Sequence, residues 1–426
     1  MIRLVVPLAD PEATDGDRFG PKAASVAALG QAGLPVPDGF CIDAEAYRLQ
    51  LKALELEAAA RGVMSTAGPE ARRHALAMRL GLMEQPVAED IAAPLVAAWR
   101  KMTGDETPGV VRSSALVEDR YGSSFAGQFE SFLDLTGETD FLTALRACWA
   151  ALWSTRALRY MAGHAIDPAE TAMGVLVQPL VAARASGGGL SLTAEGEMVL
   201  SATWGLGAPI AQGEVVPDRI RLARDGTLLE IEPGRKEHRD ACTHGLRAAA
   251  RAVPRSLVCA PCLGPAQIAT LGRLLLRAEA VMGVPVEIEW ALDEAGFKLL
   301  QARPLTVAEP AVPDEVWLQH PRLNGHPAGI GWGSGRACVV NCECELARVG
   351  PGDILVTRVA GPALSHILPR VAGVVAELGG STSHLASLAR ERGVPMVLGV
   401  LDATRRIPDG ATVAVDGVAG IVRWMA

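Results

Sequence analysis

One stretch of the sequence predicts a strand, a glycine turn and a helix in immediate succession. Residues 371–378 are an apolar run with the length of a buried strand. Gly379 and Gly380 end this run, and polar residues follow them. From His384 onward, apolar residues recur at helical spacing until Gly393, where a glycine, a valine and a proline stop the helix. The stretch therefore predicts a strand–turn–helix unit of an α/β fold, with a histidine at the start of the helix.

His384 would lie in the first helical turn, with Thr382 or Ser383 as the N-cap. A helix N-terminus carries partial positive charge and unpaired N–H groups, which suits a bound phosphate. The same charge disfavours the imidazolium form, so the ring stays neutral and nucleophilic near neutral pH. Such a histidine could attack a phosphorus atom. On these residues alone, a histidine that only hydrogen-bonds the helix start is an equally good interpretation.

The longer pattern around His384 resembles the phosphohistidine signature of the phosphoenolpyruvate-utilising enzymes. This family includes pyruvate phosphate dikinases, phosphoenolpyruvate synthases and rifampin phosphotransferases, which carry the signature on a swivelling domain. The matching pattern is Gly-Gly-x-Thr-Ser-His-x-Ala-x-x-Ala-Arg-Glu-x-Gly-Val-Pro, from Gly379 to Pro395, followed by Val397 and Gly399. The resemblance implies that His384 is the phosphorylated residue and that Thr382 and Ser383 line its site.

The length and charge of the chain argue against several classes of protein. A chain of 426 residues predicts two or three domains. A formal net charge of −8 provides no basic surface for nucleic acid and argues against an anionic membrane partner. No apolar segment is long enough to span a bilayer, and Pro7 and Asp10 interrupt the N-terminal apolar stretch too early for a signal peptide. We therefore expect a cytoplasmic location.

Eight cysteines spread over this length do not suggest a disulfide framework. Two groups are close in sequence: Cys259 with Cys262, and Cys338 with Cys342 and Cys344. Together they could supply four thiolates to a structural zinc ion. The second group is not a matching C-x-x-C, however, so free thiols are the simpler interpretation and a metal site stays open.

Several N-terminal motifs combine groups that suit a nucleotide. The stretch 19–29 predicts a glycine turn followed by a helix, with Lys22 at the helix start, where repulsion from the helix dipole makes a purely structural lysine slightly unfavourable. A short apolar strand then ends at Arg112, and a Gly/Ser loop that contains Gly127 follows. An arginine and such a loop could clamp a triphosphate, although a Gly/Ser loop alone is more often only a loop. A later buried strand ends at Gln178, where backbone groups could bind an adenine edge or simply form the core.

A strictly alternating stretch places Glu287 and Glu289 on the same face of one strand. A turn at 293–296 predicts a hairpin whose second strand carries Gln301 and Arg303 on one side. Pairing across this turn can bring Glu289 near Gln301. A carboxylate with a carboxamide oxygen suits Mg²⁺, and the arginine could neutralise a phosphate. The alternative is a surface hairpin with a charged outer face.

These motifs occur in the order found in the nucleotide-binding domain of the same enzyme family, which is similar to the ATP-grasp fold. The resemblance covers nearly the whole chain. It implies ATP contacts from Lys22, Arg112, Gln178 and Arg303, a phosphate-covering loop at Gly127, and Mg²⁺ held by Glu289 and Gln301. The sequence departs from the family pattern at Pro21, where a second glycine is usual, and after glycines 187–189, where an aromatic residue is common.

We therefore predict an α/β (α+β) fold with three segments. Residues 1–306 would form an ATP-grasp nucleotide-binding domain, and residues 330–426 a small swivelling β/α phosphohistidine domain. The Pro-rich, polar residues 307–329 show no apolar period and are predicted to be a linker.

The resemblance implies an ATP-dependent phosphotransferase of the dikinase type. Mg-ATP would phosphorylate His384 with release of AMP and phosphate, and the phosphoryl group would pass to a small-molecule hydroxyl or enolate acceptor. The chain offers no recognisable acceptor domain, so a partner subunit could carry that site. The alternative is a phosphorelay or regulatory protein whose phosphohistidine is read by another protein. No nucleic-acid or membrane partner is expected.

Overall fold

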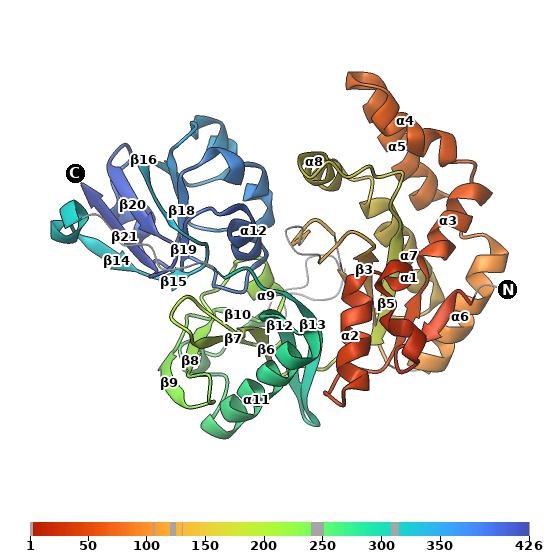
Figure 1. Cartoon of the computed structure of the whole chain (residues 1–426), viewed down its shortest axis with the longest axis horizontal. Coiled ribbons are helices and arrows are strands. Elements are labelled where there is room, and N and C mark those ends of the chain that lie inside the picture. The colour runs from red at the N-terminus through yellow and green to blue at the C-terminus, as the bar shows by residue number, and fades with distance from the viewer. Residues whose placement is uncertain are drawn as a thin grey trace. The chain divides into compact units, whose positions relative to one another are not determined.

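The computed structural model describes residues 3–104, 107–119, 125–129, 131–239, 251–307 and 315–425. The chain divides into two compact units, which we describe separately. The first unit contains the residues up to Val181 and the strand segment Lys298–Arg303. The second contains the chain from Ala182 onward apart from that segment (Figure 1).

The first unit is built on an antiparallel sheet with the strand order β1–β2–β5–β3–β4. The strands are β1 (Val5–Pro7), β2 (Phe40–Ile42), β3 (Gly109–Ala115), β4 (Ser131–Leu135) and β5 (Met173–Pro179). Every residue of β3 is buried, as expected for a central strand made largely of small and β-branched residues. The predicted strands that end near Arg112 and Gln178 are β3 and β5.

Helices surround this sheet. They are α1 (Gly16–Phe19), α2 (Pro21–Gln31), α3 (Ala44–Ala53), α4 (Glu57–Ser65), α5 (Gly68–Glu84), α6 (Glu89–Thr103), α7 (Glu138–Ala151) and α8 (Thr155–Gly163), with a 3₁₀ turn η1 (Pro11–Thr14). Gly20 precedes α2 with a φ of 79°, and a Cβ there would lie 2.1 Å from the Ser114 carbonyl oxygen. Pro21 is the first residue of α2, where its missing N–H leaves no helical bond unmade. The departure from the family pattern at this position is therefore compatible with the helix start.

The second unit begins with an antiparallel sheet in which β12, β6, β7, β8 and β9 are successive neighbours. We call this the lobe sheet. Its elements and their neighbours are β6 (Ala185–Leu190), β7 (Met198–Trp204), α9 (Ala208–Ala211), β8 (Asp218–Leu222), β9 (Leu228–Glu232), β10 (His238–Arg239), β11 (Arg251–Ala252), α10 (Arg255–Val258), α11 (Pro265–Met282) and β12 (Val286–Asp293). Helix α11 packs on the lobe sheet through buried leucines such as Leu271 and Leu275. The strand after β12 is β13 (Gly296–Pro304), so the two strands of the predicted hairpin form where expected.

The second unit also contains an eight-stranded sheet with the order β14–β21–β20–β16–β17–β18–β19–β15. We call residues 315–425, which form it, the C-terminal domain. Strands β16 to β19 run parallel and the outer strands are antiparallel. The elements are η2 (Glu315–Gln319), β14 (Arg322–Asn324), β15 (His326–Pro327), β16 (Trp332–Val340), η3 (Glu343–Arg348), β17 (Ile354–Thr357), η4 (Pro362–His366), η5 (Leu368–Arg370), β18 (Gly373–Ala376), α12 (His384–Arg392), β19 (Met396–Leu398), α13 (Ala403–Arg406), β20 (Thr412–Asp416) and β21 (Ile421–Met425).

The segment predicted as a linker, 307–329, differs from that expectation in its second half. Strands β14 and β15 belong to the sheet of the C-terminal domain, paired with β21 and β19. These strands are short and polar, and Leu323 is the buried residue of β14, so they carry no apolar period for a sequence pattern to detect. Residues 308–314 lie outside the described part of the chain.

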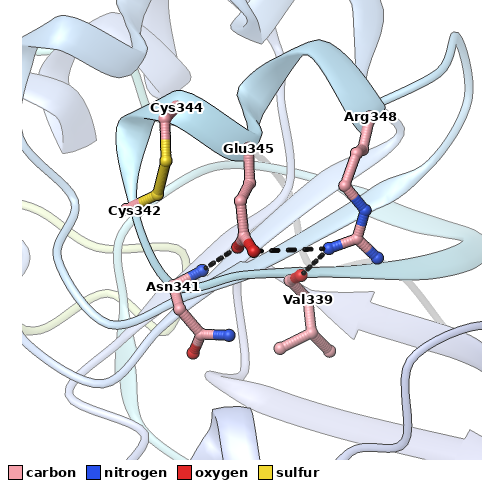
Figure 2. The surroundings of a disulfide bond; sticks show 6 residues. All are labelled: Val339, Asn341, Cys342, Cys344, Glu345 and Arg348. Atoms are coloured by element: carbon pink, nitrogen blue, oxygen red, sulfur yellow. Dashed lines mark hydrogen bonds and ion pairs between the residues drawn. A yellow bond between two sulfur atoms is a disulfide. The ribbon is translucent and has the colours of Figure 1, made fainter.

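Cys342 and Cys344 form a disulfide just after β16 (Figure 2). The Asn341 backbone N–H donates to Glu345 Oε2 at 2.8 Å, so the loop is also closed by a hydrogen bond. Neither the zinc nor the free-thiol interpretation anticipated this bond. Cys338 is buried and free, as is Cys262, whereas Cys259 is free and exposed.

Among the described residues, no group of three or more His, Cys, Asp or Glu side chains is arranged to hold a metal ion. No helix in the described ranges is long and apolar enough to cross a membrane.

Candidate functional site

The predicted strand–turn–helix around His384 is present as β18, a glycine turn and α12. Gly379 has a φ of 100°, a conformation that favours glycine. Ser383 is the N-cap, and its hydroxyl accepts a hydrogen bond from the Ala386 N–H at 3.2 Å. Gly393 ends the helix with a φ of 68°, in the left-handed region. His384 is therefore the first residue of α12, as predicted.

The hydroxyls of Thr382 and Ser383, the two residues just before His384, have different surroundings. Ser383 is fully buried and engaged in capping the helix. The Thr382 hydroxyl oxygen is also buried, but it has no hydrogen-bond partner among the described residues. A buried hydroxyl without a partner costs free energy, so a ligand with acceptor oxygens would satisfy it. This environment fits a phosphoryl group beside His384, which is itself partly buried.

Thr382 packs on the lobe sheet at strand β6. A Cβ added to Gly188 would come within 2.6 Å of the Thr382 Cβ, so the glycine leaves the space that the threonine fills. Gly188 pairs with Glu289 on β12. Because directly paired residues of neighbouring strands point to the same face, Glu289 lies on the sheet face that receives the turn before His384. The glycine run that lacks the family's usual aromatic residue is thus part of this contact.

Both glutamates of β12 lie on this face, because they are two residues apart on one strand. Glu289 is partly exposed. Glu287 is buried, and it forms an ion pair with Arg390 of α12 at 2.8 Å. The Ser387 hydroxyl donates to the same carboxylate at 3.0 Å. The alternating sequence predicts both glutamates on one face but carries no sign of the arginine partner.

In the first unit, Lys22 is buried in an ion pair. Its Nζ lies 2.6 Å from Glu118 Oε1 and donates to the Ser113 carbonyl oxygen at 2.9 Å. The other oxygen of Glu118 accepts the Ala115 N–H at 3.2 Å. The lysine therefore lies at the end of β3, next to a carboxylate that sequence analysis did not single out.

A second cluster of the first unit joins β3 to the segment Lys298–Arg303. Arg112 donates to the Gln301 side-chain oxygen at 3.0 Å, and the Gln301 amide nitrogen donates to Asp119 at 2.8 Å. Arg303 lies 3.8 Å from the other oxygen of Asp119. All four side chains are buried. The fold thus brings together three of the predicted nucleotide-site residues, and Asp119 connects two of them.

Gln178 and Gly127 are the other two residues of the first unit that are predicted to bind ATP. Gln178 is buried, and its side-chain amide donates to the Pro37 carbonyl oxygen at 3.0 Å, so its side chain anchors the preceding connection. Gly127 has a φ of 65° in the short described segment 125–129. Residues 122–124 of the predicted phosphate loop lie outside the described residues.

The two residues predicted to bind Mg²⁺ belong to different units, and each offers an oxygen donor of the kind that this cation prefers. Glu289 offers a partly exposed carboxylate. Gln301 offers a carboxamide oxygen, which has two lone pairs and can accept the Arg112 bond while facing a cation. The structure describes each ligand within its own unit.

His326 of β15 packs behind the glycine turn. A Cβ on Gly380 would lie 3.4 Å from its Nδ1 atom. Burial of the ring, and secondarily the positive charge of Arg219, lower the pKa of His326 to about 3. The ring is therefore neutral at neutral pH, and this histidine supports the turn as an uncharged group.

Comparison with known proteins agrees with this arrangement. Residues 16–319 match the family model of the pyruvate phosphate dikinase AMP/ATP-binding domain, and residues 349–420 match the mobile domain of PEP-utilising enzymes. The chain is 33% identical to phosphoenolpyruvate synthase of Aeropyrum pernix over 95% of its own length and 56% of that protein. It is 30% identical to a probable phosphoenolpyruvate synthase of Methanothermobacter thermautotrophicus over 95% of its length and 61% of that protein. The corresponding values for phosphoenolpyruvate synthase of Escherichia coli are 28%, 95% and 55%.

The fold and the site define a mixed α/β protein in which an ATP-grasp-type domain is joined to a mobile phosphohistidine-type domain. The chain belongs to the family of phosphoenolpyruvate-utilising enzymes. It spans little more than half the length of the curated relatives that it matches.

Proposed function

We propose that this chain carries out ATP-dependent phosphoryl transfer of the dikinase type, with His384 as the carrier of the phosphoryl group. The main support is the position of the turn before His384 on the lobe sheet, where Thr382 fills the space over Gly188 and Glu289 lies on the same face. A phosphoryl group at this histidine would meet a partnerless hydroxyl and a nearby carboxylate able to hold a metal ion.

In this proposal, the cations of the first unit bind and orient the nucleotide phosphates. Lys22, Arg112 and Arg303 are fixed by protein oxygens, so their charges are positioned before ATP binds. Fixed charge aimed at the transferring group usually makes the largest contribution to catalysis of phosphoryl transfer. Glu118 and Asp119 compensate the buried positive charge in the absence of phosphate, and nucleotide oxygens would compete with them.

Magnesium held by Glu289 and Gln301 would neutralise charge on the phosphate oxygens. Gln178 would bind the adenine edge through its backbone, because its side chain is already bonded to Pro37. Gly127 would allow the loop around it to approach the phosphates closely.

A neutral His384 ring nitrogen would form a bond to the β-phosphorus while the bond between that phosphorus and the α–β bridging oxygen breaks, so that the bridging oxygen leaves on AMP. Water would then cleave the β–γ bond of the histidine-bound diphosphate and release the terminal phosphate. The remaining phosphoryl group would pass to an acceptor oxygen as the bond to the histidine nitrogen breaks. A hydroxyl acceptor would lose its proton to solvent, and an enolate oxygen has none to lose. An acceptor site on a partner subunit, or on a further part of a longer chain, would complete this sequence.

We retain the three-part organisation as a proposal, with a nucleotide domain over residues 1–306 and a mobile C-terminal domain. Because strands β14 and β15 pair within that domain, the mobile part would begin by Glu315 rather than at residue 330.

The test is to incubate the protein with magnesium and ATP labelled separately at the β- and γ-phosphates. We expect acid-labile label on the protein from the β-phosphate, with AMP as the nucleotide product. The His384→Ala variant should lose this label completely while binding ATP within about twofold of the unaltered protein, because the histidine belongs to a different unit from the cation cluster.

His366→Ala is the matched control, since this exposed histidine lies in the same domain outside the motif. Label that persists in the His384→Ala variant would refute the carrier assignment. Formation of ADP with label from the γ-phosphate would indicate ordinary kinase chemistry instead.

A further inference from the structure

Helix α12 presents two different faces. Leu385, Leu388 and Ala389 are fully buried on the apolar side of the helix. Ser383, Ser387 and Arg390 follow one another at spacings of four and three residues, which places them on a common polar face. Ser387 and Arg390 bond to Glu287 of the lobe sheet, so the polar face of the phosphohistidine helix contacts that sheet.

Arg390 connects three separate pieces of chain. One of its terminal nitrogens binds the Glu287 carboxylate at 2.8 Å. The other donates to the carbonyl oxygen of Ser381, in the turn before His384, at 2.6 Å, and to that of Ala328, after β15, at 3.3 Å. The guanidinium thus links the lobe sheet directly to the turn that positions Thr382 and His384.

Much of the rest of this interface consists of close approaches by backbone and small residues. The Gly379 N–H donates to the Val215 carbonyl oxygen at 3.0 Å. A Cβ would lie 2.5 Å from a Pro217 side-chain atom if added to Gly380, and 3.3 Å from a Val216 side-chain atom if added to Gly399. Such contacts make the two surfaces complementary in shape, but they add little directional bonding between them.

A buried ion pair suits a contact that must form and open repeatedly. The attraction between the two charges is largely offset by their loss of hydration, so such a pair adds little net stability while fixing geometry. When the contact opens, water hydrates both groups again. An apolar patch of the same size would instead be exposed to water in the open state and would favour permanent closure.

We propose that Glu287 is a positioning residue that docks the phosphohistidine helix on the lobe sheet. In this role, Glu287 holds Arg390 and Ser387, and through them fixes the turn that carries Thr382 and His384 for phosphorylation. Its release frees the C-terminal domain to carry the phosphoryl group away. The catalytic part of this inference rests on the proposed function, but the docking contact itself does not.

The first experiment measures docking without nucleotide. Hydrogen exchange of the Gly379 amide reports the interface directly, because its acceptor, Val215, lies on the other side. We expect the Glu287→Gln variant to exchange this amide at least about tenfold faster than the unaltered protein. Glu197→Gln is the matched control, since it removes a carboxylate that pairs with Arg221 within the lobe sheet at a similar distance of 2.7 Å.

The second experiment measures the rate of His384 phosphorylation by Mg-ATP in a single turnover. For the Glu287→Gln variant we expect about a tenfold lower rate at saturating ATP with an unchanged ATP concentration for half-maximal rate. Glu287→Asp, which keeps the charge, should recover part of both effects. If the glutamine variant fails to give a cooperative thermal melt, the aspartate variant, together with Ser387→Ala, replaces it in both measurements.

Unchanged exchange at Gly379 in folded Glu287 variants would overturn the docking role. Faster exchange with an unchanged phosphorylation rate would overturn the positioning role. If the unaltered protein is not phosphorylated at all, the proposed function fails, yet the exchange measurement still decides whether Glu287 docks the helix.

Discussion

The cation cluster of the first unit and the contact between α12 and the lobe sheet, which we call the docking face, are built differently. In the cluster, Lys22 and Arg303 are buried beside the carboxylates of Glu118 and Asp119. The docking face has one buried ion pair, Glu287 with Arg390, and a close fit in which Thr382 occupies the space above Gly188. The first region is organised by charge alone, and the second combines charge with shape.

The difference follows from what each region must do in the proposed reaction. Buried cations without partners would be costly, so a phosphate site keeps its charges balanced before the ligand arrives. A carrier that binds and leaves needs an accurate fit without strong retention. We therefore expect substitutions in the two regions to affect different steps.

The largest effect should come from filling the space over β6. Gly188→Ala would place a Cβ 2.6 Å from Thr382, so the turn before His384 must shift. We expect about a hundredfold loss in the rate of His384 phosphorylation, because a displacement of about 1 Å can have this effect, with ATP binding unchanged. Gly163→Ala is the control, since no heavy atom lies within 4 Å of its added Cβ. A normal rate in the Gly188→Ala variant would mean that phosphorylation does not require Thr382 to occupy the space above Gly188.

Removing the buried Lys22–Glu118 pair should weaken nucleotide binding and leave the docking of α12 unchanged. The double variant Lys22→Met with Glu118→Gln avoids leaving an unpaired buried charge. We expect about a tenfold weaker binding of Mg-ATP by calorimetry, the size expected for loss of a charged hydrogen bond, with Gly379 amide exchange unchanged. The control replaces the Arg224–Glu279 pair in the same manner. Equal ATP affinity would show that this lysine only stabilises the fold.

Glu289→Gln separates metal binding from nucleotide binding. The substitution keeps the shape but removes the charge of a metal ligand, so we expect the magnesium concentration for half-maximal phosphorylation to rise about tenfold. ATP binding without metal should stay unchanged. Glu294→Gln, in the exposed turn after β12, is the control. An unaltered magnesium response would assign Glu289 a structural role only.

The last prediction concerns the pH dependence of folding stability and has no direct effect on either step of the reaction. Because the pKa of His326 is lowered to about 3, the unfolded chain takes up a proton as pH falls below about 6.5 while the folded chain does not. This histidine should therefore lower stability progressively from about pH 6.5 to pH 3, by up to about 2 kcal/mol at pH 5 relative to pH 8. Denaturant unfolding of His326→Gln, compared with His366→Gln as a control, should show a shallower pH dependence. If the stability of the two variants depended on pH in the same way, groups other than His326 would cause the pH dependence.

The local elements of the site could be predicted from sequence because their signals are local. Ser383 caps α12, Gly393 ends it, and alternation gave the two strands that carry Glu289 and Gln301. The order of the family motifs then indicated which side chains are expected to contact the nucleotide.

The partners of those side chains could not be predicted. The Lys22–Glu118 pair joins residues 96 positions apart, and the Glu287–Arg390 pair joins residues 103 apart. A charged residue in a sequence carries no sign of the partner that folding brings to it. The Cys342–Cys344 bond was missed for another reason, because two cysteines so close in sequence were considered only as metal ligands or free thiols.

The missing side chain at Gly188 limits which substitutions this chain can accept during evolution. The glycine is required by a side chain that comes 194 positions later rather than by the twist of its own strand. A larger residue in β6 would be accepted only with a smaller one in place of Thr382, so these positions should covary among descendants. Chimeras that join a nucleotide domain from one relative to a carrier domain from another should fail unless both positions are inherited together.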